Sequence, residues 1–370
     1  MIDLRTLKII HKLHNTVIAR ENDSELVRLK DPTAHGERQL VDWYFANKTA
    51  LGLPEPKDIL VITTLDPCCM CTGSLLSAGF HVIIAALDDN AGINWNNKFL
   101  FEPLEGKELK QIQKSFIYPK VRGNENRKPF GNVPAFDDKT LSAAIVQSCL
   151  DTFIEGANKA RKIIQGGIPR EQLKDIYYLR PSSPVVAALK AEYPHALEYR
   201  APSRSWPEAG LANFLIEASQ EDKRYGGDGD AVAFLDYFGN LLMCKAGRKS
   251  LSPIRTAYME TIRAYQKVRY TLSQNGNDAL AYLCDPKFGT FVFVKGFDKG
   301  AQSFADLGAY GSTILGELDN YNNLQYISPR IRHADLLEYI GKMPSRYSKL
   351  IHPKRVENQT LVTMVENSLR

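Results

Sequence analysis

Four side chains in the N-terminal part of the chain have the types and spacing of a metal-dependent hydrolytic site. Cys68 and Cys71 lie three positions apart in the segment PCCMC, a spacing that puts both side chains on one side of a helix's first turn. Thiolates at a helix N-terminus are stabilised by the unpaired backbone N–H groups there. His35 lies near the start of another predicted helix and adds an imidazole. Two thiolates and one imidazole are the ligands of a tetrahedral catalytic zinc (Zn²⁺) site with one open position.

Glu37 is the candidate proton carrier of this site. It lies two residues after His35, so its carboxylate is expected beside the open position once His35 is directed at the metal. Zinc lowers the pKa of a coordinated water towards neutrality, and the resulting hydroxide is a nucleophile. A carboxylate within hydrogen-bonding distance takes the water proton and passes it to a leaving nitrogen. The site therefore predicts hydrolytic deamination of an amidine-like carbon, such as C4 of cytosine or C6 of adenine, with release of ammonia.

The segments that carry these residues predict an α/β unit. Residues 34–50 have apolar side chains at helical spacing, and residues 67–78 form a second predicted helix. Residues 59–64 and 81–87 are short runs rich in β-branched residues, which is typical of buried strands. Both helices are expected on the same face of the sheet, on either side of the 59–64 strand, so that their N-termini meet.

The flanking segments are less regular. Residues 6–21 predict a β-hairpin that turns at His14-Asn15, and one amphipathic helix over 4–19 is the alternative. Residues 100–135 have no clear periodicity and contain a basic loop, and a helix is expected over 138–165. That loop contains a candidate binding site for a phosphate or a base, formed by Arg122, Arg127, Lys128 and Phe130. We favour the interpretation that the loop is simply solvated.

These residues resemble a known signature, the His-x-Glu and Pro-Cys-x-x-Cys pattern of the cytidine and deoxycytidylate deaminase superfamily. DPTAHGE at 31–37 resembles the DPTAHAE of the tRNA adenosine deaminase and guanine deaminase branch. PCCMCTGSLLSAGFHVIIAALDDNAGI at 67–93 resembles that branch's PCPMCxGAL block with its downstream D-x-x-A-G. The resemblance covers about residues 7–95. It implies the three-layer α-β-α fold of cytidine deaminases.

The resemblance also implies the roles of individual residues. His35, Cys68 and Cys71 correspond to the zinc ligands and Glu37 to the proton shuttle. Asn22 is the nearest counterpart of an asparagine that contacts the base in that family.

The chain departs from the family pattern in three places. Gly36 replaces an alanine, which is sterically harmless, and Cys69 replaces a proline. Cys69 is expected to point away from the ligands, and a closed structural zinc site with Cys69 as fourth ligand is the alternative, in which Glu37 would be a solvated helix residue. The family also has a helix before the hairpin. Here we expect it to be missing or replaced by the linker or the second half of the chain.

The second half of the chain repeats the order of the first. Residues 231–247 predict another hairpin, 252–263 resemble 31–42, and 291–294 resemble the 59–64 strand. A helical stretch follows at 300–315. The offset stays near 220–230 residues, which indicates an internal duplication, and two unrelated α/β domains are the alternative.

We divide the chain into a first half (1–165, the zinc-dependent deaminase domain), a connecting segment (166–206) and a second half (207–370). The second half has Thr256 and Tyr258 where the first has His35 and Glu37, and no thiolate pair takes the place of PCCMC. It is therefore expected to be a degenerate, non-catalytic deaminase-like domain. The chain would then be a monomer with an intramolecular pseudo-dimer, or a homodimer.

Composition narrows the class of partner. The chain has 370 residues, 44% of them hydrophobic, and a net charge of only +5. No apolar run is long enough for a membrane span, and the N-terminus is too charged for a secretory signal. Three of the six cysteines lie within four positions, which suits a metal better than a disulfide framework, so we expect a cytoplasmic protein.

Three functions fit these observations to different degrees. The first is deamination of a small-molecule nucleobase or nucleoside. The second is deamination of adenosine or cytidine in tRNA or another polynucleotide, which is possible but not indicated by the charge. The third is a non-catalytic zinc-binding scaffold, against which the presence of Glu37 argues.

Overall fold

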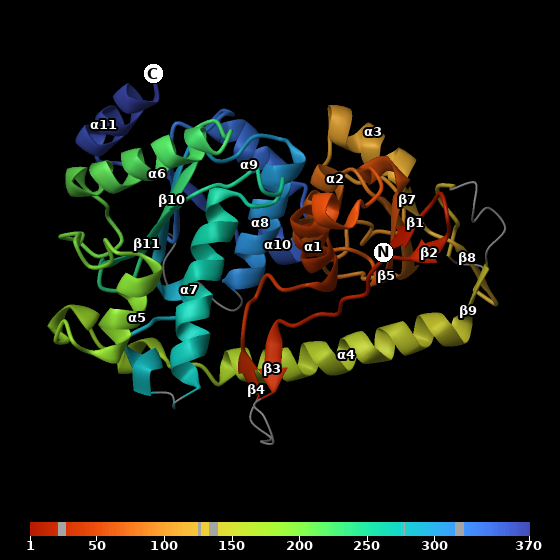
Figure 1. Ribbon diagram of the computed structural model, residues 1–370, viewed down its shortest axis with the longest axis horizontal. Helices are drawn as coiled ribbons and strands as arrows, with labels where there is room; N and C mark the ends of the chain where they lie inside the picture. The colour runs from red at the N-terminus through yellow and green to blue at the C-terminus, as the bar shows by residue number, and fades with distance from the viewer. Residues whose placement is uncertain (21–26, 125–126, 133–139, 275, 277, 315–321) are drawn as a thin grey trace.

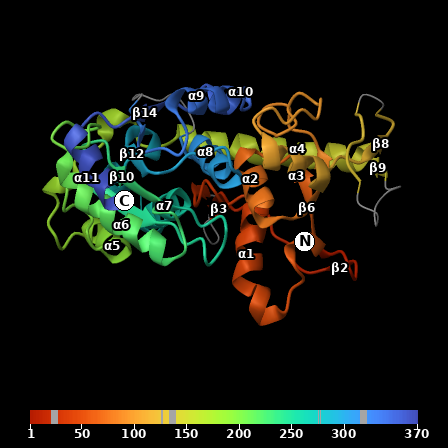
Figure 2. The same ribbon diagram turned by 90° about the horizontal axis from the view of Figure 1, so that it is seen from above.

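Two five-stranded sheets with helices between them make up most of the chain, which is a mixed α/β protein (Figure 1). The structure is a computed structural model. It describes all residues except 21–26, 125–126, 133–139, 275, 277 and 315–321. Seen from above, the first and second halves lie side by side and meet where α2 (Cys69–Ala78) faces α8 (Ala301–Thr313) (Figure 2).

The runs at 59–64 and 81–87 form the centre of the first sheet, as the sequence predicts. β5 (Ile59–Leu65) and β6 (His81–Ala86) pair in parallel, because the chain crosses between them through the helix α2 (Cys69–Ala78). The order in this sheet is β2 (Lys8–Ile9), β1 (Ile2–Asp3), β5, β6 and β7 (Phe116–Ile117), with β1 antiparallel to both of its neighbours.

The two helices beside β5 also match the prediction. α1 (Gly36–Leu51) ends at Gly52 and α2 at Gly79, and both glycines have the positive φ that closes a helix. α1 and α2 pack against each other. α4 (Ala143–Gln165), the long yellow helix in Figure 1, runs against β5 and β6.

The predicted hairpin over 6–21 is wrong, and so is its helical alternative. β2 pairs back to β1, while β3 (Ile18–Arg20) pairs with β4 (Val27–Leu29) in a separate two-stranded sheet. The two apolar runs therefore belong to different sheets. The chain between them lies across the start of α1, where the Gln39 side chain donates to the His14 carbonyl at 2.9 Å. The strands that pair with β2 and β3 lie outside residues 6–21, so the pattern within these residues could not reveal the pairing.

Two other stretches are more ordered than the sequence suggested. Residues 100–135 contain α3 (Gly106–Ser115) and β8 (Lys120–Arg122), which pairs in parallel with β9 (Thr140–Ser142). The connecting segment contains α5 (Pro184–Glu192), which packs on α7 of the second half. Its backbone also bonds to the second sheet's hairpin, as Leu197 N–H donates to the Leu241 carbonyl at 2.8 Å.

The second sheet has the same strand order and the same mixture of antiparallel and parallel pairs as the first. Its hairpin and its central strand lie where residues 231–247 and 291–294 predict them. The strands in order are β11 (Leu241–Ala246), β10 (Ala231–Leu235), β12 (Thr290–Val294), β13 (Leu324–Ile327) and β14 (Pro353–Arg355). The helices of the second half are α6 (Ala212–Arg224), α7 (Ala257–Ser273), α8 (Ala301–Thr313), α9 (His333–Gly341), α10 (Ser345–Ser348) and α11 (Gln359–Leu369).

The helices of the second half cover both faces of its sheet. α6 and α11 pack together on the side away from the first half, whereas α7 and α8 lie between the two sheets (Figure 1). All five residues of β10 and of β12 are buried. In the first sheet the outward-facing Ile62 of β5 is 48% exposed, so α4 covers that face only in part. Within the described ranges, no helix combines the length and apolar character needed to cross a membrane.

α2 and α8 join the two halves through glycines. A Cβ on Gly73 of α2 would overlap the backbone of Ala301 and Ala305, and a Cβ on Gly308 of α8 would overlap the backbone of Cys69 and Met70. Each helix therefore has a glycine where the other helix's backbone comes closest. Because glycine has no Cβ, Gly73 and Gly308 allow the backbones of α2 and α8 to come this close.

Replacing Gly308 with alanine should push α8 away from α2. We expect Gly308→Ala to lower the free energy of unfolding by about 1–3 kcal/mol, the usual cost of overpacking a tight contact. Gly156→Ala is the matched control, because Gly156 lies within α4 with open space around it and should gain up to about 1 kcal/mol from better helix propensity. Urea unfolding of both variants measures this, and equal stability of Gly308→Ala and wild type would contradict the tight packing.

Candidate metal centre

The N-termini of α1 and α2 bring the three predicted metal ligands together. His35 precedes α1 and Cys68 precedes α2 as the capping residue, and neither side chain caps its own helix. Nδ1 of His35 lies 3.6 Å from Sγ of Cys68 and 3.5 Å from Sγ of Cys71. The ligand atoms of all three residues lie within 4.8 Å of one another, so the group is a possible metal-binding triad.

Glu37 lies beside this triad, as its spacing from His35 predicts. Its Oε2 accepts a hydrogen bond from the Cys71 thiol at 3.4 Å, and its Oε1 accepts one from the Thr63 hydroxyl at 2.5 Å. Thr63 comes from β5, so the strand holds the second oxygen of the carboxylate. Thr63 is not among the residues predicted from sequence, although a hydroxyl near the carboxyl end of an apolar strand was a usable signal.

The adjacent thiols of Cys68 and Cys69 have pKa values that are shifted in opposite directions. Interaction with the neighbouring Cys71 thiol, together with the nearby His35 imidazole, lowers the pKa of Cys68 well below the ordinary value of a thiol, against burial that would raise it. Burial instead raises the pKa of Cys69 well above that value. Cys69 is fully buried and is not one of the three clustered ligands. Burial raises the pKa of Cys71 in the same way, so the pKa does not separate the two thiols. The position of Cys69 outside the cluster of ligand atoms is what agrees with the spectator role predicted for it.

A buried carboxyl group holds the loop before Cys68. Oδ1 of Asp66 accepts from the Tyr118 hydroxyl at 2.7 Å, and Oδ2 accepts from the Asn94 backbone at 2.9 Å. Burial raises the pKa of Asp66 to about 8 despite these hydrogen bonds. Gly92 lies directly against this carboxyl group, where a Cβ would overlap it, and it forms a backbone bridge with Cys68. The glycine of the D-x-x-A-G segment thus lets the loop after β6 close on the cysteine loop.

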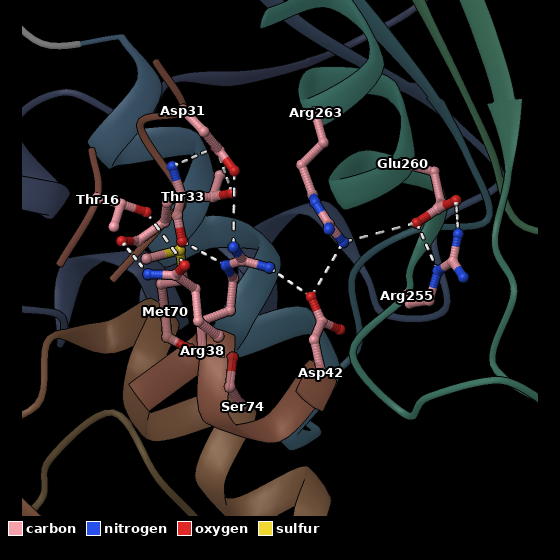
Figure 3. Close-up of polar contacts among 12 residues, drawn as sticks. Thr16, Asp31, Thr33, Arg38, Asp42, Met70, Ser74, Arg255, Glu260 and Arg263 are labelled. Atoms are coloured by element: carbon pink, nitrogen blue, oxygen red, sulfur yellow. Dashed lines mark hydrogen bonds and ion pairs between the residues drawn. The ribbon is translucent and has the colours of Figure 1, made fainter. Parts of the chain in front are cut away.

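A buried arginine holds the start of α1. The Arg38 guanidinium donates from Nε to the Thr33 carbonyl and from Nη1 to Asp42 at 2.5 Å, and its Nη2 lies 3.6 Å from Asp31 (Figure 3). Asp42 also pairs with Arg263 of α7 at 3.1 Å, so the network crosses between the halves. In the DPTAHGER segment, the acid and the arginine that flank His35 therefore fix the helix end from which His35 and Glu37 project.

Two further sequence predictions concern Asn22 and the basic loop. Asn22 lies outside the described residues. The basic loop does not match the solvated loop that we favoured, because Arg127 is buried and donates to the Ile84 carbonyl at 2.8 Å and to that of Ala85. Phe130 stacks on Phe99 at 4.6 Å between ring centroids, so this ring is already engaged within the protein.

The corresponding place in the second half has a different chemistry. Thr256 caps α7 as His35 precedes α1, and its hydroxyl donates to Asp306 at 2.5 Å. A cavity of about 20 Å³ remains beside these two residues, lined also by Lys249 and Arg330. In the part of the chain that the structure describes, no second cluster of metal ligands accompanies this cavity. The residues that could support a metal therefore lie in the first half.

Single cysteine variants should separate ligands from spectators. We expect Cys68→Ala and Cys71→Ala to lose tight metal binding, because two ligands of a triad hold a divalent ion far more weakly than three. Cys69→Ala, which changes the residue between them, should still bind one metal ion per chain. Elemental analysis after dialysis against a weak chelator measures this. Metal loss in Cys69→Ala together with retention in Cys71→Ala would contradict the assignment.

Asp306 should make stability depend on pH. Burial raises its pKa to about 7, so between about pH 4 and 7 the folded chain keeps a proton that the unfolded chain releases. The proton held by Asp306 stabilises the folded chain. This stabilisation therefore falls as the pH rises from about 4 to about 7 and levels off above that range. In urea unfolding between about pH 4.5 and 8, the free energy of unfolding of Asp306→Asn should depend less on pH than that of the wild type. Parallel curves for the variant and wild type would show that the Asp306 carboxyl is not perturbed.

Known proteins give no independent identification of this site. No family model, curated protein or solved structure matches the chain. The resemblance to zinc deaminases therefore stays an expectation from the sequence. What the site can do follows from its own residues and their arrangement.

Proposed function

We propose that the chain is a zinc-dependent hydrolytic deaminase that acts on a nucleobase or nucleoside. The observation that carries this proposal is the convergence of His35, Cys68 and Cys71 with the Glu37 carboxylate beside them. A structural zinc site normally has four protein ligands. Three protein ligands instead leave the fourth position of a tetrahedral zinc for water, next to the Glu37 carboxylate.

The spacing of the ligands fits zinc. Tetrahedral zinc holds sulfur at about 2.3 Å and nitrogen at about 2.0–2.1 Å, which corresponds to a sulfur–nitrogen separation of about 3.6 Å. The separations from His35 Nδ1 to the two sulfurs are 3.6 and 3.5 Å. Two thiolates and an imidazole are also the ligand types that zinc prefers over magnesium or calcium. A zinc ion held there would act as a Lewis acid that makes water nucleophilic at neutral pH.

Glu37 would then move the protons. Its carboxylate takes a proton from the attacking water and delivers it to the amino nitrogen, which leaves as ammonia. Thr63 holds one carboxylate oxygen, so the other oxygen stays directed at the metal site. The hydroxyl of Thr63 has a second acceptor in the Leu65 carbonyl at 3.1 Å, which keeps it in place on β5.

We also propose that the fold is a tandem pair of cytidine deaminase-like units. The two sheets share strand order and strand directions, and α1 and α7 begin one residue after His35 and Thr256, the pair that the sequence comparison aligned. The second unit lacks the zinc ligands and Glu37. In this interpretation it is a non-catalytic partner within the same chain, and the molecule is an intramolecular pseudo-dimer.

The test is ammonia release by the zinc-loaded full chain. The substrates are guanine, cytosine, cytidine, adenosine and guanosine, with transfer RNA as the polynucleotide. Glu37→Gln should lower the rate at least about 100-fold, because general acid–base catalysis contributes that much, and it should still bind zinc. Glu55→Gln is the control, since Glu55 is exposed and pairs with Lys48 at the end of α1 away from the metal site.

Two results would contradict the proposal. One is ammonia release that persists in Glu37→Gln. The other is a zinc-loaded wild type that releases no ammonia from any of these substrates. Activity on transfer RNA alone would keep the chemistry and replace the substrate class.

A further inference from the structure

A larger cavity lies at the opposite end of the second sheet from the place that corresponds to the metal centre. Its volume is about 230 Å³, compared with about 20 Å³ for the cavity beside Thr256 and Asp306, which borders the end of β12. It lies between the start of β12 and the turn after β10, and the connecting segment (166–206) supplies the rest of its lining. A space of this size suits a small organic molecule better than a single water or ion.

Two arginines of the connecting segment, Arg170 and Arg204, line this cavity, the arginine pocket. The Arg204 guanidinium lies over the Tyr237 ring at 4.6 Å and donates to the Tyr237 hydroxyl at 2.6 Å. Among the described residues, Arg204 has no carboxylate partner. Arg170 pairs with the exposed Glu171 at 3.2 Å, a surface pair of the kind that contributes little. The pocket therefore has a guanidinium whose charge the protein does not balance.

The carboxyl group of Asp236, which also lines the pocket, is already engaged. Its Oδ1 accepts from the backbone N–H groups of Phe238 and Asn240 at 2.8 Å, and its Oδ2 accepts from the Asn240 side chain at 2.9 Å. Burial raises the pKa of Asp236 to about 7, so near neutral pH this group is only partly ionised. Asp236 thus offsets the arginines only in part, and the pocket favours an anion.

Hydroxyl groups and aromatic rings complete the lining. Thr290 is only 1% exposed, and within the described ranges neither its hydroxyl nor that of Ser205 has a hydrogen-bond partner. Buried polar groups normally have a partner, so these two hydroxyls are available to a ligand. The rings of Tyr237 and Phe288 provide apolar wall. Guanidinium and hydroxyl groups bind phosphate oxygens, and aromatic side chains pack against flat rings.

The turn that carries Arg204 is fixed from two sides. Arg204 has a φ of 37°, in the left-handed region that costs free energy for a residue with a side chain. The Gln325 side chain on β13 donates to the Ser205 carbonyl at 2.6 Å. On the other side, a Cβ on Gly239 would come within 2.9 Å of the Arg204 carbonyl oxygen, so this glycine lets the turn pack closely. The guanidinium is therefore presented from a turn that the second sheet holds in place.

We propose that the arginine pocket binds a small phosphate-bearing molecule with a flat ring, of the class of nucleoside monophosphates. The phosphate meets the two arginines and the two hydroxyls, and the ring lies against Tyr237 and Phe288. This inference does not rest on the proposed function, because the pocket shares no residue with the candidate metal centre. It gives the second half of the chain a binding role of its own.

Titration calorimetry on the full chain tests this proposal. The probes are the 5′-monophosphates of adenosine, guanosine and cytidine, each compared with its nucleoside and with inorganic phosphate. We expect at least one monophosphate to bind, and its nucleoside and inorganic phosphate to bind at least about 10-fold more weakly, because each has only one of the two groups that the pocket recognises.

Two variants remove single groups from the pocket. Arg204→Gln should weaken binding of the monophosphate at least about 10-fold, the usual effect of losing a hydrogen bond between charged groups. Thr290→Val, which removes only a buried hydroxyl, should weaken it about 3-fold or more. Thermal unfolding without ligand shows whether either substitution disturbs the fold.

Arg248→Gln is the matched control. Arg248 also lies over a tyrosine ring, that of Tyr225 at 5.4 Å, but it pairs with Glu221 at 3.6 Å and does not line the pocket. This variant should keep the wild-type affinity. Cys68→Ala should keep it too, because Cys68 belongs to the candidate metal centre.

The outcomes separate this inference from the proposed function. A wild type that binds none of the three monophosphates, or an Arg204→Gln protein with unchanged affinity, would overturn the pocket assignment and leave the deaminase proposal intact. An equal loss in Arg248→Gln would also overturn it. Binding that Cys68→Ala loses and Arg204→Gln keeps would place the ligand at the metal centre instead. Inorganic phosphate that binds as tightly as the monophosphates would overturn the assignment of a ring to the ligand.

Discussion

The close contact between α2 and α8 is the interaction on which the rest of the structure depends. α2 carries Cys68 and Cys71 at its start, so whatever positions this helix also positions two of the three metal ligands. Gly73 and Gly308 let the backbones of the two helices touch with no side chain between them. Backbone-to-backbone packing of this kind leaves little freedom for sliding, because the next residue along either helix would collide. The metal ligands of the first half are thus held from the second half.

Charged groups reinforce the same junction at a second place. Asp42 of α1 accepts from both Arg38 and Arg263, one from each half. Asp42 compensates the charge of the buried Arg38, and its partly exposed pair with Arg263 adds a weaker attraction across the junction. This favours keeping the halves together whenever α1 is folded. α1 and α2, the two helices whose N-termini form the metal centre, are therefore each attached to the second half by a different kind of contact.

The elements nearest the metal centre could be predicted from sequence because their determinants are local. The strand at 59–64, the helices beside it and the ligand spacing in PCCMC all follow from patterns within a few residues. The N-terminal hairpin could not be predicted, because Ile9 pairs with Ile2 while Ile18 pairs with Leu29, and the 6–21 window contains neither partner. The close contact of α2 with α8 was equally hidden, since it joins segments that lie far apart in the sequence. Contacts between halves are set by tertiary packing, which periodicity does not encode.

The place in the second half that corresponds to the candidate metal centre is closed in a different way. In the first half, the ends of α1 and α2 present side chains that face each other without capping their helices. In the second half, Thr256 caps α7 and also bonds to Asp306, so the same place is filled by an internal hydrogen bond. Capping residues satisfy backbone N–H groups that a metal site leaves open, and they stabilise the helix they begin. The second half therefore has a closed arrangement at the place where the first half has an open one.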